Sequence, residues 1–227
     1  MTRELLRRRI EELGIIPSIR THTADEATFA AKTLALAGLP IVEVTATVPS
    51  AADVIAHLAI GLPDLIVGAG AIADLAIARQ CVRAGARFVS TTALEMPVIE
   101  LARGEGILAV TGALTPTEVM TASKAGADYI RLFPCGHVGG ASYIHALKGS
   151  FPDAPFIAAG GVSQQTAAEF IAAGAAAIGV GPELVPTKAI EHRDAHWITE
   201  LARRFLTSVH DARLQRARRH DTLDHSR

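Results

Sequence analysis

Glu43 is the residue whose surroundings first point to chemistry. It lies inside the apolar run IVEVT (41–45), which otherwise suits a buried strand. An ionised carboxylate is costly to remove from water unless a partner compensates for the lost hydration, so the sequence predicts a cation beside Glu43. Two interpretations follow: a structural salt bridge, or a general acid/base whose pKa is raised by burial.

Two arginines occupy comparable places in other apolar runs. Arg20 ends the run IIPSIR (15–20), and Arg131 lies within YIRLF (129–133). If these runs are neighbouring parallel strands, both cations and Glu43 converge at the same edge. A guanidinium fork binds a carboxylate or phosphate through two bonds, so this set of residues suits an anionic oxo acid.

Glycine-rich segments offer a second kind of chemistry, in which backbone N–H groups bind an anion. AAGGVS (158–163) and GVGP (179–182) follow the last two apolar runs, where barrels commonly hold a phosphate, although Pro182 has no N–H. GAGAIA, from Gly68, matches a dinucleotide fingerprint placed after a strand and at the start of a helix. Such a site needs an acidic residue at the end of the next strand, and none occurs before Glu95. We therefore expect no cofactor.

Cysteine and histidine residues permit two further hypotheses. Cys135 and His137 share one loop and form a conceivable thiolate and base, and His22 could join His137 and Glu43 around a metal ion. No orienting third residue accompanies the first pair, and neither H-x-x-x-H nor CxxC spacing supports the metal. We expect neither site. The P-loop and serine-hydrolase motifs are also missing from the sequence.

Composition narrows the class of partner. The chain has 227 residues, 49% of them hydrophobic and 4% aromatic, and its 22 basic and 23 acidic residues nearly cancel. No global basic field exists to attract nucleic acid. Weakly charged stretches such as 65–78 fall short of the roughly 18 to 20 apolar residues of a membrane span. Two cysteines and a charged N-terminus predict a cytoplasmic protein without disulfides, whose partner is a small molecule.

Short apolar runs alternate with Ala-rich amphipathic segments along the whole chain. Their length and β-branched content favour buried parallel strands at 15–20, 41–45, 65–68, 87–90, 107–110, 129–133, 156–159 and 177–180. Helices are predicted at 24–37, 50–60, 73–84, 95–103, 116–125, 139–148, 164–173 and 195–209. Four of them end in Ala-Gly, which is typical of a left-handed helix stop before a strand: Gly38, Gly85, Gly126 and Gly174.

Eight strand-helix units predict an α/β fold, a compact (β/α)8 TIM barrel over residues 1–209. An additional N-terminal helix, 2–13, is expected to close the barrel bottom. The alternative is a doubly wound open sheet, which periodicity does not exclude. The polar tail, 210–227, is predicted to be a solvated helix extension that frays. An RNA- or phosphate-binding arm is less favoured, because the tail lacks interleaved aromatic residues and its charge is partly cancelled.

Over residues 5–205 the chain resembles the class I 2-keto-3-deoxy-6-phosphogluconate (KDPG) and 4-hydroxy-2-oxoglutarate (KHG) aldolases. The segments that carry the resemblance stand in the family's order and spacing: IIPSIR, IVEVTATVPSA, IVGAGAI, GALTPTEV, IRLFP, YIHALKGSFPDAPFIAAGGVS and GVGPELV. The resemblance implies a (β/α)8 barrel, a homotrimer, and cleavage of a 2-oxo acid, which can be phosphorylated, to pyruvate and an aldehyde through a lysine Schiff base.

The resemblance also implies roles for individual residues. Glu43 matches the general acid/base, Arg20 the cation that receives the keto-acid carboxylate, and Gly160 and Gly161 the glycines of the phosphate loop. The other positions that it assigns to the substrate pocket are Thr47, Ala71, Thr91, Phe133 and Gly181.

The chain departs from the family pattern at positions that the resemblance assigns to catalysis and substrate binding. Arg131 stands where the family has its Schiff-base lysine, and a guanidinium stays protonated and forms no imine. The four lysines of the chain all lie in predicted helices or at helix ends: Lys32, Lys124, Lys148 and Lys188. This chain also differs from the family pattern at four other positions. Ala71 and Ala159 stand where the family has threonine, Thr91 where it has proline, and Pro182 where it has serine.

These departures leave three functions open. The first is a lyase or isomerase in which Arg20 holds the carboxylate of a small 2-oxo acid, Arg131 stabilises an enolate and Glu43 carries a proton. The second is a non-catalytic protein that binds oxo acids, and the third is aldol cleavage through another amine. The changes at Ala159 and Pro182 predict a weaker preference for phosphorylated substrates.

Overall fold

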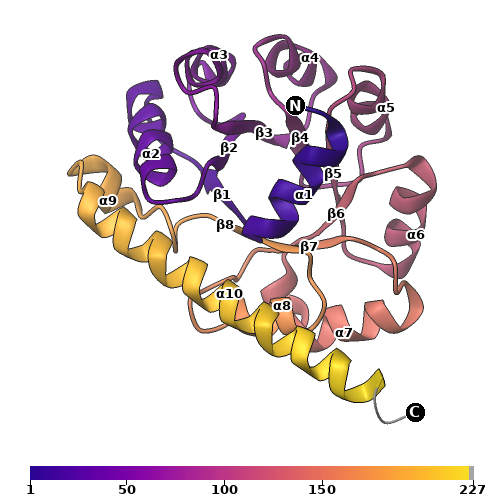
Figure 1. Cartoon of the computed structure of the whole chain (residues 1–227). Helices are drawn as coiled ribbons and strands as arrows, with labels where there is room; N and C mark the ends of the chain where they lie inside the picture. The colour runs from indigo at the N-terminus through magenta and orange to yellow at the C-terminus, as the bar shows by residue number, and fades with distance from the viewer. Residues whose placement is uncertain (225–227) are drawn as a thin grey trace.

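Eight parallel strands close into a barrel in chain order, as the computed structural model shows for the described residues (Figure 1). The structure describes the backbone of residues 1–224 and the side chains of residues 1–218. The closed order confirms the predicted (β/α)8 barrel and excludes the open sheet. The strands are β1 (Ile15–Ile19), β2 (Ile41–Thr45), β3 (Ile66–Ile72), β4 (Phe88–Thr91), β5 (Leu108–Ala113), β6 (Tyr129–Leu132), β7 (Phe156–Ala159) and β8 (Ala177–Val180).

Helices cover the outside of the barrel. They are α2 (Ala24–Leu36), α3 (Ala51–Gly61), α4 (Leu75–Arg83), α5 (Met96–Gly104), α6 (Pro116–Ala125), α7 (Gly140–Ser150), α8 (Ala167–Ala172), α9 (Thr187–Glu191) and α10 (Ala195–Asp224), with a 3-10 turn η1 (Cys135–Val138). The glycines at 38, 85, 126 and 174 all have positive φ, as predicted for helix stops. The turn η1 and the short helix α9 were not anticipated from periodicity, because each is too short to carry a helical pattern.

The additional N-terminal helix, α1 (Arg3–Leu13), closes one end of the barrel. Its buried residues Leu6 and Ile10 pack on side chains from the beginnings of the strands, including Phe88 and Tyr129. A larger apolar layer fills the space between the strands and the outer helices. The end of the barrel at which the strands begin is therefore occupied by packed side chains.

The segment GAGAIA belongs to strand β3 rather than to a helix start. Strand β3 continues to Ile72, and α4 begins only at Leu75, after Asp74 accepts a hydrogen bond of 2.7 Å from the Ala76 N–H. A Cβ on Gly70 would lie 2.3 Å from the Glu43 carboxylate. This glycine makes room for a side chain inside the barrel, so the placement expected for a dinucleotide fingerprint is wrong.

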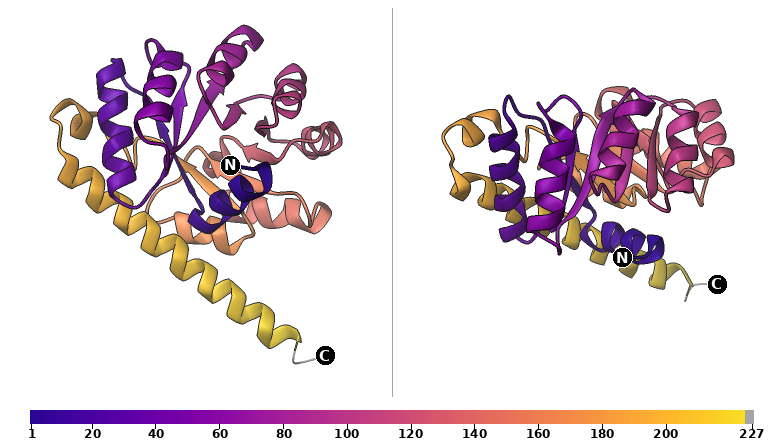
Figure 2. Two further views of the ribbon diagram at one scale, coloured as in Figure 1. Left: turned by 45° about the horizontal axis from the view of Figure 1, so that its top comes forward. Right: turned by 90° about the horizontal axis from the view of Figure 1, so that it is seen from above.

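Helix α10 runs without a break across the predicted end of the barrel domain at residue 209, and its far end extends beyond the barrel (Figure 2). Val209 and Ala212 are buried. Arg213 donates hydrogen bonds of 2.6 and 2.8 Å to the carbonyls of Glu12 and Ala176. The first turn of the predicted tail is thus attached to the barrel bottom. Within residues 1–224, no helix is both long and apolar enough to cross a membrane.

Candidate active site

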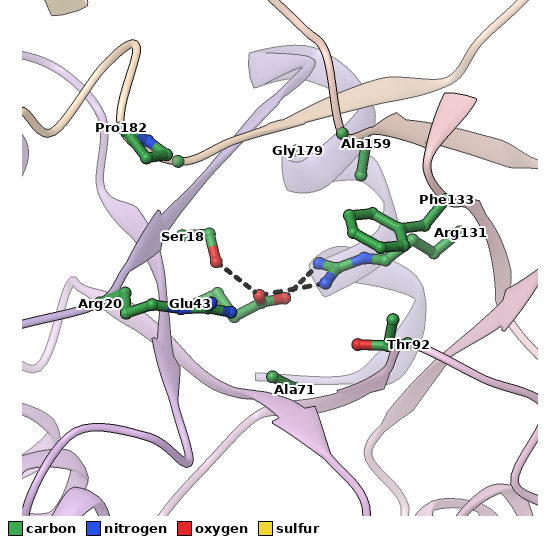
Figure 3. Close-up of a pocket in the computed structure, with 12 residues that line it drawn as sticks. Ser18, Arg20, Glu43, Ala71, Thr92, Arg131, Phe133, Ala159, Gly179 and Pro182 are labelled. Carbon is green, nitrogen blue, oxygen red and sulfur yellow. Dashed lines mark hydrogen bonds and ion pairs between the residues drawn. The ribbon is translucent and has the colours of Figure 1, made fainter. Parts of the chain in front are cut away.

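A pocket of about 250 Å³ opens at the end of the barrel where the strands finish (Figure 3). Its lining comes from all of the strands except β5, or from the loops that follow them. The lining residues are Ser18, Arg20, Glu43, Ala71, Thr92, Arg131, Phe133, Ala159, Gly160, Gly179, Gly181 and Pro182. Active sites of (β/α)8 enzymes lie at this end, because the loops there vary while the barrel holds their bases fixed.

Glu43 and Arg131 form an ion pair across the inside of the barrel. Strands β2 and β6 are four positions apart in either direction around the closed sheet, so their inward side chains face each other. Arg131 Nη1 donates to Glu43 Oε1 at 3.2 Å, and Nη2 makes a shorter contact with Oε2. Glu43 is 0% exposed and Arg131 7%. The cation that burial of Glu43 required is therefore Arg131.

Two hydroxyl groups complete the surroundings of the Glu43 carboxylate. Ser18 on β1 donates to Oε1 at 2.9 Å, and Ser90 on β4 donates to Oε2 at 2.6 Å. With the two terminal nitrogens of Arg131, these hydroxyl groups bring the number of donors to the Glu43 carboxylate to four. An ionised carboxylate has about four lone-pair sites, so its capacity to accept hydrogen bonds is filled. Ser18 and Ser90 were not anticipated, because nothing in the sequence distinguishes a strand serine that reaches into the pocket from any other.

Burial raises the pKa of the Glu43 carboxyl, but the charge of Arg131 and the hydrogen bonds from Arg131, Ser90 and Ser18 together lower it below its ordinary value. The expectation that burial leaves this pKa raised is therefore wrong. The reason is geometric, since the compensating cation lies in contact with both carboxylate oxygens. Glu43 enters any reaction at neutral pH as a carboxylate.

Each arginine in the pocket retains capacity to bind an anion. The Nε of Arg131 is buried and has no hydrogen-bond partner among the described residues. Arg20 is exposed at the mouth, with no hydrogen bond or ion pair to the described part of the chain. Arg131 thus has one buried donor to spare at the floor of the pocket, and Arg20 presents a full guanidinium at its mouth (Figure 3).

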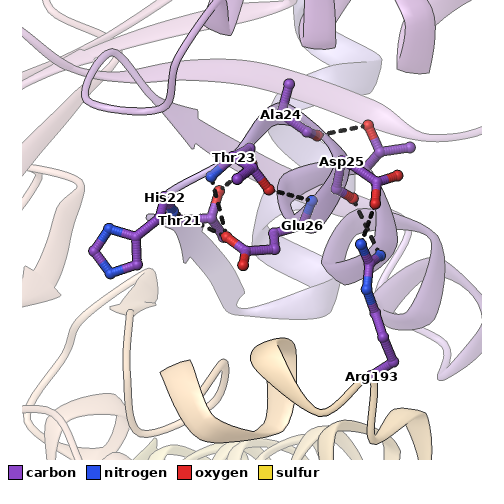
Figure 4. Close-up of polar contacts among 8 residues, drawn as sticks. Thr21, His22, Thr23, Ala24, Asp25, Glu26 and Arg193 are labelled. Carbon is purple, nitrogen blue, oxygen red and sulfur yellow. Dashed lines mark hydrogen bonds and ion pairs between the residues drawn. The ribbon is translucent and has the colours of Figure 1, made fainter.

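The loop that carries Arg20 toward the pocket is fixed at the start of α2. Thr23 and Glu26 form a capping box, in which Glu26 accepts hydrogen bonds of 3.0 Å from the N–H groups of both His22 and Thr23. Arg193 pairs with Asp25 from the turn after α9 (Figure 4). The imidazole of His22 points away from this cluster. The backbone beside Arg20 is therefore held in place, while its side chain is left available.

Five of the eight predicted substrate-binding residues line the pocket: Arg20, Ala71, Phe133, Gly160 and Gly181. The other three lie outside its lining. Thr47 is exposed and shares a 2.7 Å hydrogen bond with Thr45. Thr91 is buried and donates to the Ala93 carbonyl at 2.6 Å, so that its neighbour Thr92 reaches the pocket instead. Gly161 lies against Gly136.

The cysteine and metal hypotheses find no support in the geometry. Cys135 is buried, and burial raises its pKa to about 11, which disfavours the nucleophilic thiolate. His137 is exposed and makes no hydrogen bond with Cys135 in the part of the chain described. Nor does any group of three or more His, Cys, Asp or Glu residues, among those described, form a possible metal site.

No lysine side chain lines the pocket. Lys32 and Lys124 are exposed on α2 and α6, and Lys188 is exposed on α9. Lys148, on α7, donates hydrogen bonds of 2.9 and 2.7 Å to the carbonyls of Pro152 and Ala154. The nitrogen-bearing side chains that line the pocket are therefore those of Arg20 and Arg131, whose protonated guanidinium groups do not condense with a ketone.

Known proteins with similar sequence and structure include aldolases. The family model described as KDPG and KHG aldolase matches residues 6–201. A 2-dehydro-3-deoxy-phosphogluconate aldolase of Pseudoalteromonas atlantica is 30% identical over 189 residues, 83% of this chain and 88% of that protein. The KHG/KDPG aldolase of Escherichia coli K12 is also 30% identical, covering 83% and 89%.

One similar crystal structure records a covalent reaction. It is KDPG aldolase of Legionella pneumophila with pyruvate captured at low pH as a covalent carbinolamine intermediate. It is 26% identical to this chain, with a TM-score of 0.81 and coverage of 86% of this chain and 95% of that one. A carbinolamine needs an amine to add to the carbonyl carbon.

Proposed function

Because the chain belongs to the KDPG and KHG aldolase family, we propose that it is a lyase-type enzyme acting on a small 2-oxo acid without a lysine Schiff base. The observation that carries the proposal is the Glu43–Arg131 ion pair at the floor of a pocket that no lysine lines. On the resemblance, we further propose a homotrimer that works in the cytoplasm.

In the proposed reaction Arg20 binds the carboxylate of a 4-hydroxy-2-oxo acid, and the C2 oxygen accepts a hydrogen bond from Arg131. Glu43 takes the proton of the C4 hydroxyl. The bond between C3 and C4 breaks, its electron pair forms an enolate on C2 and C3, and an aldehyde leaves. Glu43 then returns the proton to C3, which gives pyruvate. No proton is gained or lost overall, and the negative charge that develops on the C2 oxygen meets a fixed cation.

Two features of the site support these roles. The lowered pKa of Glu43 keeps the carboxylate ionised, as a proton acceptor requires. The Nε of Arg131 is a buried donor without a partner among the described residues, so once substrate binding gives access to it, a hydrogen bond to the C2 oxygen does not require breaking the contacts of Nη1 and Nη2 with Glu43. We expect turnover slower than that of an imine mechanism, because a hydrogen-bonded enolate is a weaker electron sink than an iminium ion.

A second candidate function is binding of 2-oxo acids without catalysis. One observation favours it: the Glu43 carboxylate already accepts hydrogen bonds from Ser18, Ser90 and both terminal nitrogens of Arg131. A carboxylate with all its acceptor sites occupied has to release one donor before it can receive a substrate proton. In a binding protein the same network would only hold Arg131 in place.

Three measurements with pyruvate separate these functions. Exchange of the pyruvate methyl protons in D2O, followed by proton NMR, is expected with the unaltered protein and expected to be lost with Glu43→Gln. Glu118→Gln, which removes a carboxylate from the α6 capping box instead, is the matched control. A raised melting temperature without exchange would favour the binding protein. A mass increase after borohydride treatment would instead establish an amine mechanism, and would contradict both proposals.

A further inference from the structure

The pocket has two unlike sides (Figure 3). All of its charged and hydroxyl-bearing side chains come from the first six strands or the loops after them: Ser18, Arg20, Glu43, Thr92 and Arg131. Residues from the ends of β6, β7 and β8 form the other side, here called the apolar wall: Phe133, Ala159, Gly160, Gly179, Gly181 and Pro182. The apolar wall has no side chain that can donate a hydrogen bond or carry a charge.

The loops after β7 and β8 are where (β/α)8 barrels commonly hold a phosphate, through backbone N–H groups and a helix start. Here several of these groups are already in use. Ser163 N–H donates to the Thr166 hydroxyl at 2.9 Å, and the N–H groups of Leu184 and Val185 both donate to the Gly181 carbonyl at 3.0 Å. Pro182, which lines the pocket, has no N–H.

The charge of this end of the barrel also disfavours a phosphate. Two arginines and one glutamate line the pocket, so the lining carries a single net positive charge. Glu183 follows Pro182 directly, and its exposed carboxylate has no ion-pair partner among the residues the structure describes. A phosphorylated sugar acid would bring a doubly charged group toward the loop after β8, beside the exposed carboxylate of Glu183.

The apolar wall instead offers a surface against which an apolar group of a ligand can pack. The Phe133 ring is 41% exposed, an unusual state for a large aromatic side chain, and it lies at the pocket. It is packed against Gly160, where a Cβ would come within 2.8 Å of the ring. The ring is thus held in position with one part covered by protein and the remainder free for a ligand.

From these observations, and resting on the proposed function above, we infer that the substrate is an unphosphorylated 2-oxo monocarboxylate with a short apolar substituent. The carboxylate and the C2 oxygen bind on the charged side, at Arg20 and Arg131. The substituent at C4 lies against the apolar wall. Pro182 and Glu183 are the residues that exclude a phosphate. An aldol substrate of this class is 4-hydroxy-2-oxopentanoate, which would yield pyruvate and acetaldehyde.

Isothermal titration calorimetry of the unaltered protein tests this inference with defined probes: 2-oxobutyrate, 2-oxoglutarate, 2-keto-3-deoxy-6-phosphogluconate and inorganic phosphate. We expect 2-oxobutyrate to bind more tightly than the phosphorylated acid by about tenfold or more, and inorganic phosphate not to compete with it. Tighter binding of the phosphorylated acid or of 2-oxoglutarate would overturn the inference and leave the proposed function standing. Failure of every 2-oxo acid to bind would overturn both.

Two variants test the residues named. Pro182→Ser restores a backbone N–H and adds a hydroxyl, and Glu183→Gln removes only an exposed charge, so that one informative variant remains if the other folds poorly. Each is expected to raise affinity for 2-keto-3-deoxy-6-phosphogluconate severalfold. Glu183→Gln changes a residue outside the pocket lining, so it should leave affinity for 2-oxobutyrate unchanged. If folded variants show the same ratio of affinities as the unaltered protein, Pro182 and Glu183 do not set the preference.

Discussion

Arg131 and Glu43 come from opposite sides of the barrel, 88 residues apart in the chain, and meet through both oxygens of the carboxylate. The pair lies at the floor of the pocket and is almost completely removed from solvent. The Arg131 guanidinium therefore helps to hold the pKa of the Glu43 carboxyl below its ordinary value. The same contact links the stability of the barrel, its response to pH and the chemistry available to a ligand.

Separating this pair is expected to cost substantial stability. Arg131→Met leaves a buried carboxylate without its cation, and Glu43→Gln leaves a buried guanidinium without its anion, so each should lower the free energy of unfolding by about 3 to 5 kcal/mol. The double variant should lose clearly less than the sum, as a urea-denaturation cycle would show. Glu4→Gln, in an exposed pair with Arg8, is the control and should cost at most about 0.5 kcal/mol. Additive losses would mean that the two residues do not interact.

The lowered pKa of Glu43 predicts the direction of its contribution to acid stability. The folded-state pKa lies below the ordinary value of 4.5, so the stabilisation is fully present above about pH 4.5. It is lost as the pH falls through the lower, folded-state value. In Arg131→Met the charge and hydrogen bonds that mainly lower the Glu43 pKa are gone, so burial raises this pKa above its ordinary value. The contribution of Glu43 to stability then changes with pH in the opposite direction. That variant should become less stable as the pH rises above about 4.5, measured by urea midpoints across the range.

Glu118 provides the comparison for this pH dependence. Its pKa is lowered by hydrogen bonds from Thr115 and Leu114 at the start of α6, so it contributes a trend of the same sign as Glu43. Because Glu118 is unchanged in Arg131→Met, its contribution cancels in the difference from the unaltered protein. Parallel pH profiles for the two proteins would contradict the assignment of Arg131 as the cause.

Arg131→Lys is expected to permit imine formation. It places an amine beside the Glu43 carboxylate. In the similar KDPG aldolase of Legionella pneumophila, pyruvate was captured as a covalent carbinolamine. After treatment with pyruvate and borohydride, mass spectrometry should show one reduced adduct on this variant and none on the unaltered protein. Arg20→Lys, which adds an amine at the pocket mouth instead, is the matched control and should remain unmodified. An adduct on the unaltered protein would show that another amine reacts.

Both cysteines are expected to be inert in the folded protein. Burial raises the pKa of Cys81 and raises that of Cys135 to about 11, so little thiolate exists near neutral pH and each sulfur is covered. An aromatic disulfide reagent at mildly alkaline pH should detect no thiol until guanidinium unfolds the chain, and then two. Rapid reaction of one thiol before unfolding would reopen the nucleophile hypothesis for Cys135.

Arg213 is expected to anchor the extended part of α10. Its two hydrogen bonds reach carbonyls at the bottom of the barrel, beside the end of α1. Arg213→Gln should therefore lower the free energy of unfolding by about 1 to 3 kcal/mol. Arg203→Gln, on the same helix but in an exposed pair with Glu200, should change it by no more than about 0.5 kcal/mol. Equal effects would mean that the attachment of α10 contributes nothing to stability.

The sequence determined the architecture, because its signals are local and repeated. Eight short apolar runs, the helices between them and the Ala-Gly stops predict a (β/α)8 barrel, and every strand lies where a run was found. The same pattern indicated that Arg20, Glu43 and Arg131 meet at one end. Parallel strands of a closed barrel all finish on the same side, so the residues near their ends converge whatever the details of packing.

Only the tertiary structure decided which atoms meet. Glu43 meets Arg131 because β2 and β6 lie on opposite sides of the closed barrel. It meets the hydroxyl groups of Ser18 and Ser90 because these side chains, on β1 and β4, also point into the barrel. These contacts turn the expected rise in the pKa of Glu43 into a fall. Hydrogen bonds and ion pairs depend on distances of a few ångströms between residues far apart in the chain, and no local pattern records such distances.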